Sequence, residues 1–123
     1  MICRLIKPEI VVETGVEHGI STTLILWALN KNAKGTLYSI EVLEHLLNGR
    51  RPGWLVPADV RGRWKLIIGN SLEVLPKLLE TCYVDMFIHD SEHSYETMMA
   101  EYNLAWRRIK PGGLLLSDDT GRN

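Results

Sequence analysis

Short apolar runs alternate along this chain with longer stretches in which apolar residues recur at helical spacing. Five of these runs, each bounded by polar or turn-forming residues, predict strands at 9–13, 36–41, 64–68, 84–89 and 114–117. The stretches between them predict helices at 21–32, about 42–47, 70–81 and 95–109. Strands that alternate with helices are typical of a parallel sheet with helical crossovers. The pattern therefore predicts an α/β fold.

The helix over 95–109 is the most strongly marked. Glu96 and Glu101 stand early in it and Arg107 and Arg108 late, as the helix dipole favours, and 111–113 should stop it. We expect its Met and aromatic stripe to lie in the core, comprising Tyr95, Met98, Met99, Tyr102, Ala105, Trp106 and Ile109.

The segment 48–63 differs from the rest of the chain in composition. It holds Pro52, Pro57 and three glycines, which break regular structure. We expect a long surface loop, which is a candidate for substrate contacts.

Length, composition and charge narrow the class of protein. With 123 residues, 46% of them hydrophobic and 24% charged, the chain should form a single globular domain, 1–123. Its 14 Lys and Arg balance 15 Asp and Glu without a basic block, which argues against a nucleic-acid partner. No apolar run approaches the roughly 20 residues that cross a bilayer, and no secretion signal is recognisable. We therefore expect a cytoplasmic protein without a membrane partner.

Cys3 and Cys82 are the two cysteines, far apart and without a CxxC pattern. This spacing argues against a disulfide framework or a zinc site, so both should be reduced thiols.

The most informative motif follows the first predicted strand, where open parallel sheets bind ligands, and reads Glu13-Thr14-Gly15-Val16-Glu17-His18-Gly19-Ile20-Ser21. A dinucleotide site would need GxGxxG for a pyrophosphate, but Glu17 occupies the place of the second glycine and brings negative charge. A positively charged ligand without phosphate fits better. The alternative is a simple glycine turn with solvated acids.

This motif resembles the first motif of class I S-adenosylmethionine-dependent methyltransferases, in which an acidic residue precedes GxxxG and a small hydroxyl residue. The resemblance implies a Rossmann-like three-layer αβα sandwich with strand order 3-2-1-4-5. It implies S-adenosylmethionine as cofactor, bound by Glu13, Gly15, Glu17, Gly19 and Ser21. A side chain at Gly15 or Gly19 would fill the space that the methionine part of the cofactor needs.

Polar residues at the next strand ends extend this resemblance. Glu41 closes the second strand, where such folds place the carboxylate that binds the ribose hydroxyls, although an exposed strand-end acid is the alternative. Asn70 and Ser71 stand where the family places polar residues near adenine, but Asn70 is equally suited to cap a helix.

The fourth and fifth predicted strands end in a dense set of titratable groups, typical of functional sites. Residues 89–96 and 110–119 resemble the subgroup of macrocin O-methyltransferases and cephalosporin hydroxylase-like proteins, and the likeness spans about 7–119. It implies a magnesium site at Asp90, Asp118 and Asp119, with Asp90 also near the cofactor. The alternative is a turn-capping Asp90 with the other two solvated. Asp90 and His93 are the candidate catalytic residues, His93 as general base for an acceptor hydroxyl or, equally, as a hydrogen-bonding partner near adenine.

The expected activity is methyl transfer to a hydroxyl of a small-molecule or sugar-like acceptor. Family members continue beyond the fifth strand with two more strands, so we expect a C-terminally truncated core. A catalytically silent binding or assembly module is therefore an alternative, and a nicotinamide-dependent oxidoreductase is a third. In the family strand order, truncation leaves Leu114, Leu115 and Leu116 on an edge without protective charge, which predicts a homodimer through that edge.

Overall fold

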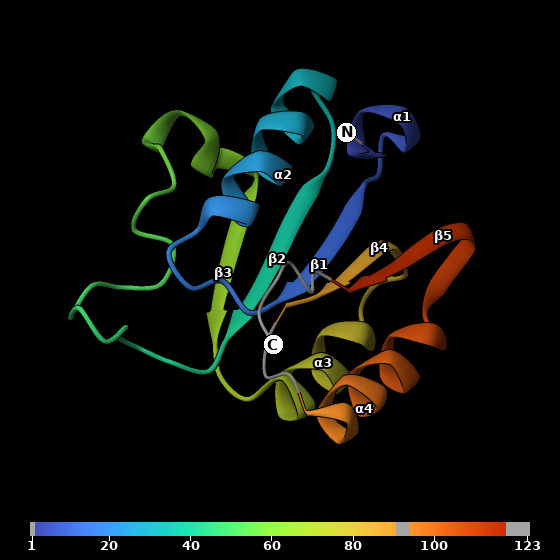
Figure 1. The fold of residues 1–123 in the computed structure, drawn as a ribbon. Coiled ribbons are helices and arrows are strands. Elements are labelled where there is room, and N and C mark those ends of the chain that lie inside the picture. Colours follow the sequence, from blue (N-terminus) through green and yellow to red (C-terminus); the bar gives the residue numbers. More distant parts are fainter. Residues whose placement is uncertain (1, 91–93, 118–123) are drawn as a thin grey trace.

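The computed structural model describes residues 2–90 and 94–117, which form a parallel sheet with helices on both faces (Figure 1). The strand order is β3-β2-β1-β4-β5. The strands are β1 (Ile10–Thr14), β2 (Thr36–Glu41), β3 (Trp64–Ile68), β4 (Val84–His89) and β5 (Ile109–Ser117). The predicted α/β class and strand order are confirmed, and every strand points its carboxyl end toward the same edge of the sheet.

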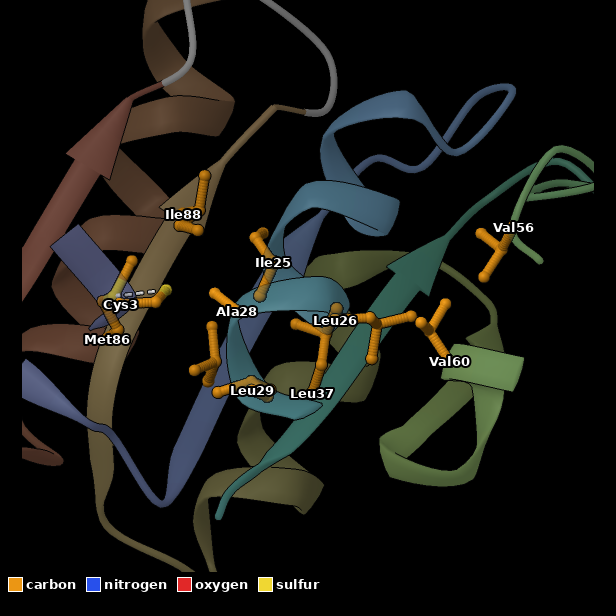
Figure 2. Close-up of a cluster of buried hydrophobic side chains, with 11 residues drawn as sticks. Cys3, Ile25, Leu26, Ala28, Leu29, Leu37, Val56, Val60, Met86 and Ile88 are labelled. Carbon is orange, nitrogen blue, oxygen red and sulfur yellow. Dashed lines mark hydrogen bonds between the residues drawn. The ribbon is translucent and has the colours of Figure 1, made fainter. Parts of the chain in front are cut away.

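Two helical layers cover the sheet. One face carries α1 (Ile2–Ile6), α2 (Ile20–Asn32) and the 3-10 helix η1 (Ala58–Arg63), and the opposite face carries α3 (Ser71–Leu79) and α4 (Tyr95–Trp106) (Figure 1). Residues of β1 alternate between these layers, as the strand period of two requires. Val11 packs in the α2 layer, which Figure 2 shows around Leu26 and Leu37, whereas Val12 packs with Phe87 in the other layer.

Side-chain caps explain where two helices begin. The side-chain oxygen of Asn70 accepts the backbone N–H of Leu72 at 2.9 Å, so Asn70 is the N-cap of α3. Ser94 caps α4 in the same way through the N–H of Thr97 at 3.2 Å. The capping alternative for Asn70 is thus confirmed.

The prediction of a helix over 42–47 was wrong. Its backbone groups bond within turns instead, since the N–H of Leu43 donates to Glu41 and the N–H of Leu46 donates to the carbonyl of Arg50 at 2.8 Å. The loop predicted over 48–63 is correct in part, because its last six residues form η1.

The Pro-Gly-Gly sequence at 111–113 does not separate a helix from a strand as predicted. The helix α4 ends earlier, at Trp106, and β5 already begins at Ile109, with a register irregularity opposite Val84 and Met86. Strand β5 is an edge of the described sheet, and an edge strand accommodates a proline without a ladder donor.

The predicted core stripe of α4 is correct in part. Ala105 is buried and Tyr102 packs against the core, but Tyr95 is 71% exposed and Trp106 is 69% exposed. Glu101, which the sequence placed early in the helix as the dipole favours, is fully buried instead.

The two cysteines are free, as predicted. Cys3 is buried in the α2 layer with its Sγ 3.7 Å from the Sδ of Met86, and burial raises the pKa of its thiol (Figure 2). Across the described residues, no helix combines the length and the apolarity that a bilayer-spanning segment needs.

Candidate functional site

The loop over 15–19 joins β1 to α2 at the carboxyl edge of the sheet. Its turn depends on left-handed backbone at Gly15 (φ 89°), Glu17 (φ 51°) and Gly19 (φ 99°). The N–H of Gly15 donates to the carbonyl of Ile40 at 2.8 Å, so the loop starts beside the end of β2. Glu17 lies exposed on this loop, at the edge where parallel sheets bind ligands.

Glu41 holds this loop in place. One of its carboxylate oxygens accepts the backbone N–H groups of Val16 at 2.9 Å and Glu17 at 3.2 Å. The other accepts the N–H of Leu43 at 3.1 Å. The side chain is 6% exposed, so the exposed-acid alternative is wrong. Glu41 therefore lies at the strand end predicted for it and also fixes the backbone of the glycine motif.

Glu13 occupies a different place from the one its motif implied. It is fully buried on the α2 side of β1, where its carboxylate accepts the hydroxyls of Thr22 and Ser39, each at 2.6 Å. Ser39 in turn accepts the indole N–H of Trp64 at 2.8 Å. Because no surface of Glu13 is open, the side chain supports the loop from beneath, and its predicted contact with a cofactor is untested.

The hydroxyl of α2 that Glu13 binds belongs to Thr22. Ser21, the small hydroxyl residue of the motif, is half-buried in the first turn of α2. The sequence did not single out Thr22 or Ser39, because only the packing of α2 and β2 against β1 brings their hydroxyls to the acid.

The space beside Gly19 is filled by the 48–63 segment. A Cβ at this position would lie 2.8 Å from the Cγ2 of Val56 and 2.9 Å from the Cα of Gly53. The interpretation that Gly19 leaves room for a cofactor is therefore corrected, since the glycine allows two loops to approach each other.

Hydrogen bonds also fasten the 48–63 segment to the glycine motif. The N–H of Gly53 donates to the carbonyl of Glu17 at 2.8 Å, and the N–H of Leu55 donates to the carbonyl of His18 at 3.1 Å. The indole N–H of Trp54 donates to the Nδ1 of His18 at 2.8 Å. These three hydrogen bonds join the two segments beside the site.

Besides the hydrogen bonds around Glu13, a second buried network lies at the carboxyl ends of the strands, on the face of the sheet that α4 covers. Glu101 is 0% exposed and accepts the hydroxyl of Thr14 at 2.6 Å through Oε1. The same oxygen lies 2.7 Å from the Nδ1 of His89, and Oε2 accepts the hydroxyl of Ser71. Glu101 thereby ties the ends of β1 and β4 to the start of α3. The predicted contact of Ser71 with a cofactor is untested, and its hydroxyl serves this network.

Asp90 follows β4 directly. Its backbone N–H donates to the carbonyl of Thr14 at 2.7 Å, and the residue is 9% exposed. Asp90 thus lies at the end of β4, as predicted, and beside the end of β1. The other proposed catalytic and metal residues, His93, Asp118 and Asp119, lie outside the described residues. Within 2–90 and 94–117, no three His, Cys, Asp or Glu residues come together as a metal site.

Whether a cationic cofactor fits here depends on the charges at the carboxyl ends of the strands. Glu17 on the loop, Glu41 after β2 and Asp90 after β4 bring carboxylates to the ends of three adjacent strands. These negatively charged hydrogen-bond acceptors suit a ligand with positive charge and hydroxyl groups, and they repel phosphate. The residues present therefore fit S-adenosylmethionine better than a dinucleotide.

Comparison with protein families agrees with this chemistry. A family model for a methyltransferase domain matches residues 12–120. No curated protein matches the chain.

Solved structures share the fold. A candidate O-methyltransferase from Klebsiella pneumoniae is 26% identical, with a TM-score of 0.79, over 95% of this chain and 51% of its own. The O-methyltransferase TomG from Streptomyces achromogenes, which is involved in tomaymycin synthesis and was solved with S-adenosylmethionine, is 21% identical. The match covers 95% of this chain and 51% of TomG, with a TM-score of 0.78.

The methyltransferase MycE of the mycinamycin biosynthetic pathway was solved with magnesium and S-adenosylhomocysteine. It is 19% identical, with a TM-score of 0.66, over 90% of this chain and 28% of its own. At a sequence identity this low, the similarity shows only that the two proteins share a fold. The chain spans about half the length of the first two structures.

Proposed function

This chain belongs to the methyltransferase domain family, and from that premise we propose that it binds S-adenosylmethionine and serves methyl transfer to a hydroxyl of a small-molecule or sugar-like acceptor. The observation that carries the proposal is the buried carboxylate of Glu41 at the end of β2, bonded to the amides of the 15–19 loop. The O-methyltransferases among the similar structures support a hydroxyl acceptor.

The cofactor would lie across the ends of β1, β2 and β4. Glu41 is the proposed partner of the ribose hydroxyls, because a carboxylate can accept further hydrogen bonds beside those from the loop amides. Glu17 and Asp90 would contribute negative charge near the sulfonium and ammonium groups. Backbone of Gly15 and Gly19 would shape the loop around the methionine part. Asn70 caps α3 and is proposed to lie near adenine.

S-adenosylmethionine supplies an electrophilic methyl group, and the transfer asks the protein mainly for alignment of the acceptor with it. The loop over 15–19 is fixed from three directions, by Glu41, by Glu13 through Thr22, and by the 48–63 segment. A site held in this way loses little motion when a ligand binds, which favours alignment.

The roles of the remaining predicted residues are part of the proposal. Asp90 and His93 are proposed to receive or orient the proton of the acceptor hydroxyl. Magnesium is proposed at Asp90 with Asp118 or Asp119, supported by the oxygen-ligand chemistry of carboxylates and by the magnesium in the MycE structures. We also propose a cytoplasmic location.

Isothermal titration with S-adenosylhomocysteine tests the cofactor. We expect saturable binding by the folded protein, and tighter binding than NADH shows. The absence of heat at millimolar S-adenosylhomocysteine would refute the proposal, and tighter binding of NADH would favour the oxidoreductase. Methyl transfer to any hydroxyl acceptor would separate an enzyme from a catalytically silent binding module.

A further inference from the structure

A concave surface lies beside the segment between β2 and η1, and none of the carboxylates assigned to the cofactor lines it. The segment between β2 and η1 extends past the β3 side of the sheet (Figure 1). Between this segment and β3 is an open groove of about 890 Å³, to which Arg50, Arg51, Trp54, Arg61 and Trp64 contribute. We call it the arginine groove. Its volume is within the range of roughly 300 to 1,000 Å³ that small-molecule sites occupy.

All the charged side chains that line the arginine groove are positive. Three guanidinium groups line it, and its remaining lining residues are glycine, proline, tryptophan and leucine, with no carboxylate among them. The whole chain carries a net charge of -1, so this concentration of positive charge is a local feature. The nearest ion pair, Arg51 with Glu44 at 4.0 Å, joins two exposed side chains and is therefore weak.

Two of the arginines lie over tryptophan rings. The Cζ of Arg50 is 4.2 Å from the centroid of Trp54, and the Cζ of Arg61 is 5.0 Å from that of Trp64. Stacking keeps a guanidinium flat and restricts its rotamers, which lowers the entropy lost when it binds an anion. The indole surfaces also offer an apolar wall for a planar group.

Arg61 is anchored further by the backbone. Its Nε donates to the carbonyl of Val56 and its Nη2 to the carbonyl of Gly53, each at 3.1 Å. A guanidinium has five N–H donors, so donors remain for a ligand. Arg50 and Arg61 are thus held by contacts within the protein before any ligand arrives.

We propose that the arginine groove binds a small organic anion, in which a carboxylate, sulfate or phosphate meets the guanidinium groups and a planar or apolar part lies against the indoles. Planar forks of this kind suit the oxygens of such anions. None of the carboxylates assigned to the cofactor lines the groove, although Trp54 of the groove also donates to His18 of the glycine motif.

The four tryptophans provide a local readout. Trp54 and Trp64 line the groove, whereas Trp27 on α2 and Trp106 on α4 are exposed elsewhere. In a ¹⁵N-labelled protein, phenyl phosphate should shift the indole N–H signals of the first two in a saturable manner and leave the other two in place. Inorganic phosphate should act more weakly, and phenol more weakly still.

Variants identify the side chains responsible. The double variant Arg50→Gln, Arg51→Gln should weaken phenyl phosphate binding at least tenfold, while Arg107→Gln, an exposed arginine on the opposite layer, should leave it unchanged. Both variants must retain the dispersed spectrum of the folded protein.

Three results would overturn the proposal. One is equal shifts of all four indoles, and another is unchanged affinity in the double variant. The third is a short oligothymidine that binds more tightly than phenyl phosphate with a steep salt dependence, since this would indicate a nucleic-acid surface. None of these outcomes depends on S-adenosylhomocysteine binding, so the two proposals fail separately.

Discussion

Glu101 is fully buried although it is a charged residue in the middle of a helix. Its carboxylate is enclosed between α4 and the sheet and is shared by Thr14, His89 and Ser71. A buried carboxylate is tolerated only when such partners replace its water. Glu101 therefore joins three elements at the edge that carries the proposed site.

Removing this carboxylate should destabilise the fold strongly. Glu101→Ala leaves Thr14 and His89 without their acceptor and opens a cavity, so we expect a loss of about 3 kcal/mol or more in the free energy of unfolding. Glu96→Ala, at an exposed position of the same helix, should change it by less than about 0.5 kcal/mol. Urea denaturation of both variants measures the difference. Equal stability of the two would contradict the network.

Gly19 provides a second test at a single residue. Its φ of 99° and the contacts its Cβ would make with Val56 and Gly53 predict that Gly19→Ala costs about 2 kcal/mol. Gly62→Ala is the matched control, because a Cβ there meets nothing within 4 Å. Thermal unfolding should separate the two variants clearly. A Gly19→Ala protein as stable as the control would show that the 48–63 segment does not pack against this glycine.

At the scale of elements, the sequence predicted β2, β3 and β4 with their observed bounds. These strands are compact apolar runs between polar turns, so their limits are local. The predicted limits were wrong where they depend on tertiary contacts. Residues 42–47 are drawn into turns next to Glu41, and Pro111 is accepted within β5 because that strand lies at an edge.

The start of α3 was predictable because a cap is a local signal. Asn70→Ala removes the acceptor for the N–H of Leu72, so we expect a loss of about 1 kcal/mol in stability. Asn103→Ala, in the exposed middle of α4, should be neutral or slightly stabilising because alanine favours helix. Chemical denaturation distinguishes them. A neutral Asn70→Ala would argue against the cap.

At the scale of the whole molecule, it could be predicted that the glycine motif and Glu41 lie together, because the carboxyl ends of adjacent parallel strands lie at the same end of the sheet. The supporting residues could not be predicted. Thr22 and Ser39 carry no sequence signal of their own, and His89 was marked only as part of the titratable set after the fourth strand. The roles of all three arise when the helices pack on both faces. For the same reason Glu13, which the motif assigned to the cofactor, proved to lie beneath the loop.

The assembly of the chain remains a prediction. Within the described residues β5 pairs with β4 alone, and Leu114, Leu115 and Leu116 are half-buried along that edge. We expect the 123-residue chain to sediment at micromolar concentration as a dimer of twice 14.0 kDa, joined at or beside β5. Exposed Tyr95 and Trp106 are candidates for the same contact. A monomer at this concentration would contradict the prediction.

The central claim is that Glu41 and the loop it holds form the site for S-adenosylmethionine. Its most direct test is calorimetric titration of S-adenosylhomocysteine into the wild type, Glu41→Ala and Glu9→Ala. Glu9 lies exposed before β1, at the opposite edge of the sheet. We predict at least roughly tenfold weaker binding for Glu41→Ala, because charge-assisted hydrogen bonds are lost, and wild-type affinity for Glu9→Ala. A folded Glu41→Ala variant with wild-type affinity would contradict the account.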